Sequence, residues 1–256
     1  MMKVVSVERV LWLLKSALLL QCVGVFFYLK GGSPIETMLF MELGLEQSQS
    51  KFLENIVAWV FLVFGAIAFF RPNRYLLVFI ALLTLGLAYV IKRQAGSPFT
   101  DWSIPAHFVR IILPIGILSL TNYKKNVNVA YWILLVGLSI TFITHGLEAW
   151  SLHPRFIDYL LISSENTFGI RLKQFQAEIV LKIIGLLDIL AALSAIVFST
   201  NAVLYWMAFW GFITAFARVT ELGLGLYPEV LIRAGHYLVP IGLVWLNGIR
   251  KEPKAP

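Results

Sequence analysis

The sequence is poor in charge and in thiols. Asp, Glu, Lys and Arg make up 14% of its 256 residues, against roughly 25% in an average soluble domain. Its single cysteine, Cys22, excludes an internal disulfide and a CxxC relay. The sequence has no P-loop, no dinucleotide-binding glycine fingerprint and no Ser/His/Asp order. These absences argue against a soluble domain, against thiol redox chemistry within the chain and against the common nucleotide-dependent enzymes.

Apolar residues are abundant instead. They make up 59% of the chain, and the mean hydropathy is +0.81. Runs long enough to cross a bilayer recur along the whole length. No small-residue cleavage site follows the first run, so we expect that run to be retained as a span. The sequence predicts an all-α, polytopic integral membrane protein with about eight spans: 11–29, 56–70, 75–91, 106–120, 129–150, 179–198, 202–219 and 231–246.

The connections between the predicted spans alternate between short basic turns and long mixed loops. The turns RPNR, TNYKKNVN and STN lie on the same side as both termini, where Glu8 and Glu252 are the only acids. Short basic connections face the cytoplasm. We therefore predict a cell-membrane protein with both termini in the cytoplasm. The net charge of +7 then reflects topology and lipid headgroups rather than nucleic-acid binding. The basic residues on that side are Lys3, Arg9, Arg71, Arg74, Lys124, Lys125, Arg250, Lys251 and Lys254.

The two halves of the chain, 1–125 and 126–256, have the same outline, and the second ends in a short basic tail. Each half has a span, a long loop, two spans joined by a tight turn, another loop and a closing span that contains Pro-Ile-Gly. The loop segments GGSPIETMLF and LHPRFIDYLL also match, and they predict short surface helices at 34–43 and 154–161. A four-span unit returns the chain to its starting side. The pattern therefore predicts two parallel four-helix repeats.

This architecture resembles the DoxX-like group of four-span bacterial membrane proteins, duplicated in tandem over nearly the whole chain. The resemblance rests on the early glycine-containing span followed by KGGSP and on the closing Pro-Ile-Gly span. It implies a redox-linked or quinone-linked membrane protein. It carries over no catalytic residues, so whether the protein is an enzyme stays open.

The two closing spans share a second pattern, HFVRIILP at 107–114 and RAGHYLVP at 233–240, with His and Arg exchanged. Arg110 and His236 each lie ten residues before the predicted span end, about 15 Å deep at 1.5 Å per residue and near mid-membrane. His107 and Arg233 lie one turn further out. Ionisable groups at such depth are costly and are usually functional or paired.

Each of these patterns ends in a proline, which cannot donate a hydrogen bond to the carbonyl four residues earlier. Pro114 frees the carbonyl of Arg110, and Pro240 frees that of His236. We expect a kink at each proline. A freed carbonyl inside a membrane needs a partner.

Further charged groups come mainly from the second half. The predicted spans 56–70 and 75–91 contain no charged residue, whereas the matching spans of the second half carry Lys182, Asp188 and Arg218. Asp188 lies ten residues before the end of its predicted span and therefore near mid-membrane. His145, Glu148 and Glu221 fall near the outer boundary. His145 and Glu148 form a single His-x-x-Glu motif, and bundle metal sites need several such motifs, so we predict no metal site. The candidate ligand-binding residues are Arg233, His236, His107, Arg110, Asp188 and Arg218.

Three hypotheses stay open. The first is a redox-linked or binding accessory protein with an outward-opening polar pocket for a small lipophilic or anionic ligand, with a quinone as the leading guess. That pocket would be lined by Arg233, His236, Asp188, Arg218 and the face that carries His107 and Arg110. The second is a small-molecule transporter, because parallel repeats and kinked mid-membrane helices are typical of that class. The third is a non-catalytic scaffold in which the buried charges only hold helices together. The expected partners are the lipid bilayer and other membrane subunits.

Overall fold

The computed structural model describes residues 6–95, 99–121 and 126–251, and this part of the chain is helical without strands. Six single helices and the segment Phe99–Thr121 are long and apolar enough to cross a membrane. The bent pair Leu224–Ile232 and Ala234–Lys251 makes an eighth span when counted as one. The chain is an all-α polytopic membrane protein. Its helices are α1 (Val7–Gly31), α2 (Pro34–Met41), α3 (Gln47–Phe70), α4 (Arg74–Gln94), η1 (Phe99–Trp102), α5 (Ser103–Ala106), α6 (Phe108–Thr121), α7 (Val127–Trp150), α8 (Pro154–Phe168), α9 (Gln174–Phe198), α10 (Asn201–Leu222), η2 (Leu224–Leu226), α11 (Tyr227–Ile232) and α12 (Ala234–Lys251).

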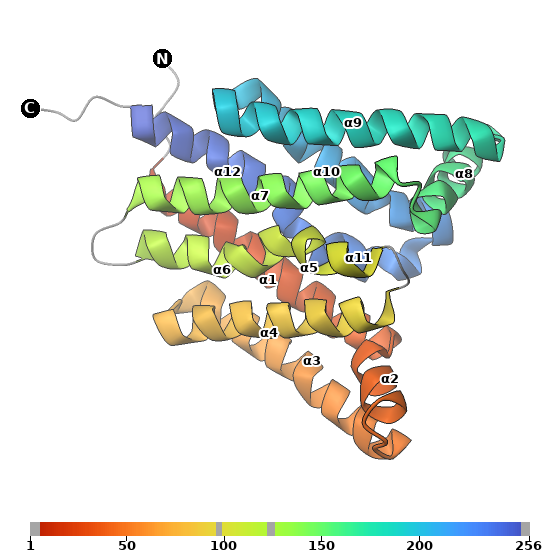
Figure 1. Ribbon diagram of the computed structural model, residues 1–256. Coiled ribbons are helices and arrows are strands. Elements are labelled where there is room, and N and C mark those ends of the chain that lie inside the picture. Colours follow the sequence, from red (N-terminus) through yellow and green to blue (C-terminus); the bar gives the residue numbers. More distant parts are fainter. Residues whose placement is uncertain (1–5, 96–98, 122–125, 252–256) are drawn as a thin grey trace, which may run out of the picture.

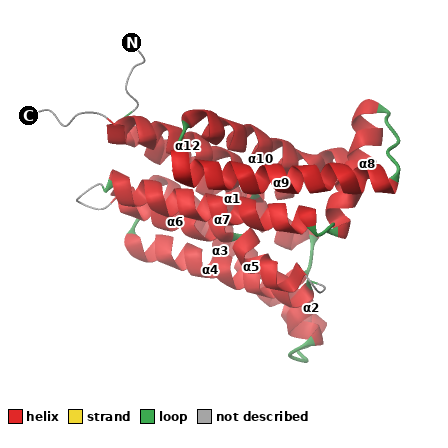
Figure 2. Ribbon diagram, turned by 45° about the horizontal axis from the view of Figure 1, so that its top comes forward, coloured by secondary structure: helices red, strands yellow, loops and turns green. Residues whose placement is uncertain are grey.

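The long helices run side by side, with both termini at one end of the bundle and the short helices α2 and α8 at the other (Figures 1 and 2). The predicted surface segments 34–43 and 154–161 are these two helices, each opened by a proline in its first turn. We call the two ends of the bundle the termini end and the α8 end.

Four helices form the middle of the bundle, and a pair of helices flanks each side. Helices α1, α6, α7 and α12 pack together, with α3 and α4 on one side and α9 and α10 on the other (Figure 1). The same pairings occur in both halves: α1 with α3 and α7 with α9, α4 with α6 and α10 with α12. The flanking helices expose large apolar side chains, such as Trp59 and Phe209, as a bilayer requires. The predicted tandem duplication and its DoxX-like origin stay predictions.

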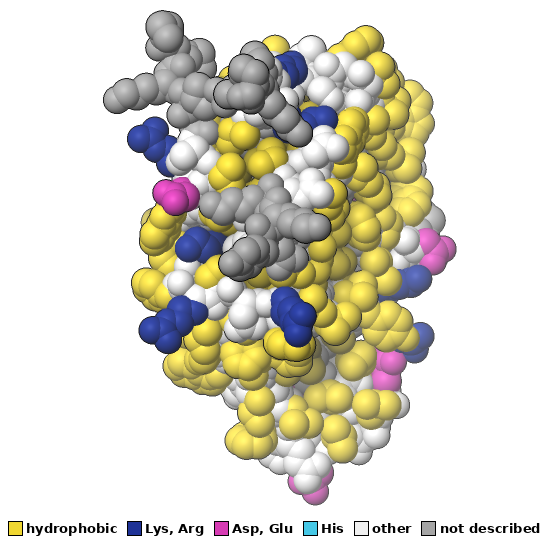
Figure 3. Space-filling view, turned by 90° about the vertical axis from the view of Figure 1, so that its left-hand side faces the viewer, with side chains coloured by type: hydrophobic (Ala, Val, Ile, Leu, Met, Phe, Trp, Pro, Cys, Tyr) yellow, Lys and Arg dark blue, Asp and Glu magenta, His cyan; other side chains and the backbone are white. Residues whose placement is uncertain are grey.

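Basic side chains gather at the termini end, among apolar side chains that continue along the flanks (Figure 3). Arg9, Arg71, Arg74 and Lys251 are exposed there. Lys3, Lys124, Lys125 and Lys254 lie outside the described residues. This bias is the ground for predicting a cytoplasmic termini end, and that orientation stays a prediction.

Each closing span has a non-helical residue seven positions before its proline. Pro114 and Pro240 lie inside α6 and α12, and the regular helix is interrupted earlier, at His107 and Arg233. At Arg233 the span is bent by 44°. The kinks expected at the two prolines stay predictions. These two residues have ψ angles of 3° and 13°, far from the helical value of about −42°. The amide of Arg110 donates to the carbonyl of His107 at 3.0 Å, and that of His236 to Arg233 at 2.8 Å. Each break therefore separates the two members of one His/Arg pair.

The two carbonyl groups that the prolines leave without a helical hydrogen bond contact different neighbours. The side-chain Nε2 of Gln21 on α1 donates to the carbonyl oxygen of Arg110 at 3.2 Å. The carbonyl of His236 lies against Gly211 of α10, so closely that a Cβ built on Gly211 would come within 2.6 Å of the oxygen. The close packing of α10 on α12 therefore depends on the missing side chain at position 211.

Replacing Gly211 tests this contact. We expect Gly211→Ala to destabilise the protein by about 1–3 kcal/mol, because its Cβ meets backbone that cannot swing aside as a side chain does. Gly86→Ala is the matched control, because position 86 is an exposed helical site with open space around it. There alanine should stabilise the helix by about 0.5–1 kcal/mol. Thermal unfolding in detergent measures both, and equal midpoints would contradict the proposed contact.

Candidate functional site

A cavity of ≈ 410 Å³ lies among α7, α8, α9, α10 and α12. Its size falls within the range of about 300–1,000 Å³ that small-molecule sites occupy. All five helices belong to the second half of the chain, where the sequence concentrates its charged residues within the spans. The residues that line it are Phe142, His145, Ala149, Phe156, Tyr159, Leu160, Ser163, Ser164, Thr167, Phe168, Leu172, Leu181, Ile184, Asp188, Trp210, Gly211, Ile213, Thr214, Phe216, Ala217, Arg218, Thr220, Arg233 and His236.

The cavity wall is mainly apolar and aromatic, with its charged groups on three helices. Asp188 comes from α9, Arg218 from α10, and Arg233 and His236 from the broken span α11–α12. The predicted residues Arg233, His236, Asp188 and Arg218 therefore lie around one space. A few polar groups in an otherwise apolar pocket are typical of a site that orients a small molecule.

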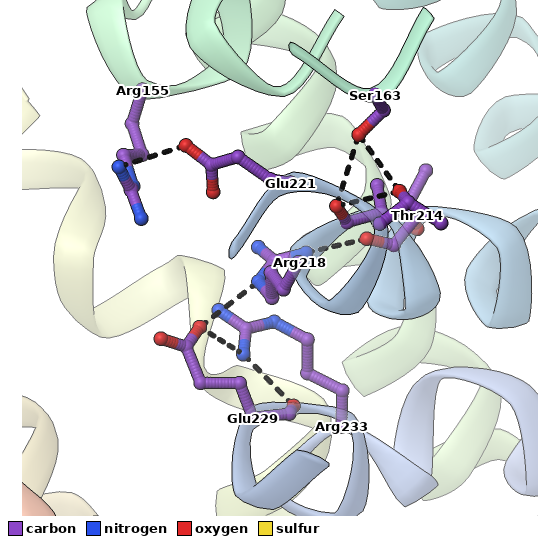
Figure 4. A network of polar contacts seen from close by, with 9 residues as sticks. Arg155, Ser163, Thr214, Arg218, Glu221, Glu229 and Arg233 are labelled. Atoms are coloured by element: carbon purple, nitrogen blue, oxygen red, sulfur yellow. Dashed lines mark hydrogen bonds and ion pairs between the residues drawn. The ribbon is translucent and has the colours of Figure 1, made fainter. Parts of the chain in front are cut away.

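Glu229 holds the two cavity arginines (Figure 4). Its Oε2 accepts a hydrogen bond from Nε of Arg218 at 3.1 Å and from Nη1 of Arg233 at 3.1 Å. Nη1 of Arg233 also donates to the carbonyl of Glu229 at 3.0 Å, and Nη1 of Arg218 donates to the carbonyl of Thr214. One carboxylate thus joins α10, α11 and the residue at the break before α12. The guanidinium groups are fixed in place by the shared carboxylate, while each keeps N–H groups outside these contacts.

A second polar group ties α8 to the end of α10 (Figure 4). Arg155 of α8 approaches the buried carboxylate of Glu221 to 3.0 Å, without the alignment of a hydrogen bond. Thr220 donates to Oγ of Ser163 at 2.8 Å, and Asn166 donates to the carbonyl of Thr220 at 2.9 Å. These contacts hold α8 against the end of α10.

His236 is the most unusual group in the site. Its side chain is buried, with 5% of its surface exposed, and neither ring nitrogen has a hydrogen-bond partner among the described residues. Asp188 is 6% exposed, and its Oδ1 atom is likewise buried without a hydrogen-bond partner among the described residues. Buried polar atoms without partners cost about 1–3 kcal/mol each. In a cavity, such atoms are available to a bound molecule.

His145 links His236 to the α8 end of the bundle. The ring centroids of His145 and His236 are 5.7 Å apart, and Nδ1 of His145 lies 2.8 Å from Oε2 of Glu148. The predicted boundary pair His145/Glu148 is therefore a contact in the structure, with His145 on the cavity wall and Glu148 behind it. Among the described residues, no three His, Cys, Asp or Glu side chains converge to hold a metal ion.

His153 lies between α7 and α8 and caps α8. Its Nδ1 accepts a hydrogen bond from the amide of Arg155 at 3.2 Å. Burial lowers the pKa of His153 below its usual value of 6.5, while the nearby Glu148 acts in the opposite direction. The neutral ring, which a lowered pKa favours, is the form that can accept this hydrogen bond.

The other predicted pair, His107 and Arg110, lies apart from the cavity. Nδ1 of His107 is 2.6 Å from the carbonyl of Ser103, one turn earlier. Arg110 is buried, its Nε has no hydrogen-bond partner, and no carboxylate of the described residues lies within 4.0 Å of its guanidinium group. Neither residue lines the cavity. The first half therefore contributes packing beneath the site rather than part of its wall.

Sequence reasoning missed several residues of the site. Glu229 was assigned to a loop, although its i,i+4 spacing from Arg233 on a helix is a recognisable ion-pair signal. Tyr159 stacks beneath the guanidinium group of Arg218, 4.7 Å from its ring centroid, and Trp210 lines the opposite wall. Aromatic residues are common throughout this chain, so nothing in the sequence distinguishes these two.

The role of Glu229 can be tested by removing its charge. We expect Glu229→Gln to destabilise the protein by about 3–5 kcal/mol, because two largely buried guanidinium groups lose their shared carboxylate. Glu165→Gln is the matched control, because it breaks an exposed pair with Arg171 that should contribute less than about 1 kcal/mol. Thermal or denaturant unfolding in detergent compares them, and similar losses would show that Arg218 and Arg233 do not depend on Glu229.

Comparison with known proteins identified no relative of the chain. No family model matches the chain, and neither a curated protein nor a solved structure matches it. The functional argument therefore rests on the geometry of the site.

Proposed function

We propose that this multi-pass membrane protein binds a small lipophilic molecule whose head is an oxo- or hydroxy-substituted ring, of the quinone or quinol type. The observation that carries the proposal is His236, which presents two buried ring nitrogens without partners to the cavity. A neutral histidine has one donor and one acceptor. It therefore suits a ligand with carbonyl or hydroxyl oxygens.

The charges around the cavity support a neutral head over an anion. Arg218 and Arg233 contribute two positive charges, and Glu229 and Asp188 contribute two negative ones, so their formal sum is zero. Glu229 balances part of the positive charge that would otherwise attract an anion. The buried cavity-lining atoms without partners belong to His236 and Asp188, and an anionic head would meet the carboxyl group of Asp188.

Aromatic side chains support a flat ring. Phe142, Phe156 and Trp210 line the cavity together with Tyr159. Offset or edge-on contacts between aromatic groups add about 0.5–1.5 kcal/mol beyond the burial of area. The resemblance to DoxX-like proteins implies the same ligand class from an independent direction. We propose binding and no chemical step.

Ligand binding gives a direct test with matched variants. The probe is a dimethoxy-methyl-benzoquinone that carries a decyl chain, added to the protein in lipid nanodiscs. We expect His236→Leu to weaken binding about tenfold or more, because each hydrogen bond lost inside a closed site costs about 1–3 kcal/mol. His107→Leu makes the same exchange outside the cavity and should bind as the wild type does.

Melting temperatures of both variants separate binding from folding. The proposal fails if the two folded variants bind the probe equally well. It also fails if the wild type does not bind the probe.

A transporter is the second candidate, because the site adjoins a broken span. The bend of 44° between Leu224–Ile232 and Ala234–Lys251 places Arg233 at a discontinuity, as in many transporter sites. A Thr214→Cys variant in a Cys22→Ser background would place the only thiol on the cavity wall. A transporter should expose it to an impermeant maleimide from both sides of a proteoliposome in turn, whereas labelling from one side alone would exclude this candidate.

A further inference from the structure

Part of the cavity wall also belongs to the outer surface of the bundle. Phe168 exposes 74% of its side chain, Ile213 40% and Phe216 41%, and all three line the cavity. Ile213 and Phe216 lie three residues apart on α10 and share a helix face. Ile184 of α9, which is half-buried, completes the rim. We call these four residues the lateral window.

The lateral window opens on a face that is apolar throughout. Beside it, Ile183 and Leu187 of α9 and Phe209 and Phe212 of α10 are exposed. Ile213 follows the first residue of α10 by twelve positions, which places it about 18 Å along a helix about 33 Å long. Ile213 therefore lies at the depth of the hydrocarbon part of a bilayer, whereas Phe168, at the end of the surface helix α8, lies nearer the boundary.

The polar and apolar groups of the cavity are arranged from the centre of the bundle outward. His236 and His145 belong to α12 and α7, two of the four middle helices, whereas the lateral window belongs to α8, α9 and α10. Toward the α8 end, the ion pair Arg155–Glu221 and the hydrogen bond Ser163–Thr220 join α8 to α10. The apolar part of the cavity rim lies on the side of the bundle, at the lateral window.

We infer that the bound molecule carries a hydrocarbon chain that passes through the lateral window into the bilayer, while its ring stays at His236 and Asp188. This inference rests on the proposed function and adds the ligand's form and its route. Lipid tails and apolar side chains solvate a chain about equally well, so the chain loses little on leaving the cavity. A ligand of this form reaches the site from the membrane and need not cross water.

The inference explains why an amphiphile fits better than a compact molecule. A compact ligand would leave Phe168, Ile213 and Phe216 around an unfilled opening, whereas a chain extends the apolar contact from the cavity to the lipid. A phospholipid acyl chain would also fill the opening, but it carries no group for His236. The ring and the chain can therefore be tested separately.

The experiment blocks the lateral window and compares two probes with the same ring. One probe is the decyl-substituted dimethoxy-methyl-benzoquinone, and the other has the same ring without the chain. Ile213→Trp enlarges a side chain on the rim. Ile183→Trp makes the same exchange at an exposed position of α9 that does not line the cavity. Dissociation constants are measured in nanodiscs.

We expect Ile213→Trp to weaken binding of the decyl probe about tenfold, because the larger side chain overpacks the rim by about one side-chain fragment. The chainless probe should bind Ile213→Trp and the wild type alike, and Ile183→Trp should change neither. If Ile213→Trp does not fold, Phe216→Ala provides the opposite change. It should speed dissociation of the decyl probe and leave the chainless probe unaffected.

The outcomes separate the two proposals. Failure of both probes to bind the wild type overturns the proposed function, and the window inference with it. Binding of both probes with no selective effect of Ile213→Trp or Phe216→Ala overturns the window alone. Dodecanol, which has a chain and no ring, should bind much more weakly than the decyl probe. Equal binding would make the cavity a general lipid groove and would overturn the inference.

Discussion

The site depends on one carboxylate that two arginines share. Glu229 lies on α11, Arg218 on α10, and Arg233 at the break before α12, so their contacts fix three elements at one point. Buried charges in a membrane are usually paired. The triad satisfies this requirement and also sets the direction in which α12 leaves the break. His236, one turn further on, is thereby directed into the cavity, and the helices around it supply apolar and aromatic walls.

Composition and hydropathy were sufficient to predict the class of the protein and its spans, because a bilayer imposes length and apolarity on each crossing helix. The prolines before residues 35 and 155 predicted the two short helices for a similarly local reason. The interruptions of the two closing spans were not predicted. A proline inside a helix removes one hydrogen bond, which neighbouring groups such as Gln21 can replace, whereas these interruptions are residues with a non-helical ψ angle. His107 and Arg233 carry that angle, and no sequence pattern marks it.

The sequence predicted those features of the candidate site that depend only on how deep a residue lies in the membrane. Counting residues from the span ends placed Asp188 and His236 at one level, and the structure places both on one cavity. Which helix faces meet is a tertiary property, so the sequence could not separate Arg110, which lies away from the cavity, from Arg218, which lines it. The role of Glu229 was not predicted, because its helix is so short that the sequence indicates a loop there. The halves share their helix pairings, yet the cavity lined by Asp188, Arg218, Arg233 and His236 is in the second.

The contact between Gly211 and the carbonyl of His236 has a mechanical consequence. His236 lies on the segment between the break at Arg233 and Pro240, which omits a backbone hydrogen bond. Within this segment, the close approach of α10 at Gly211 holds the backbone at the carbonyl of His236. The imidazole ring is therefore carried on backbone that a neighbouring helix supports from the side, and its adjustment to a bound molecule is confined to its side-chain torsions.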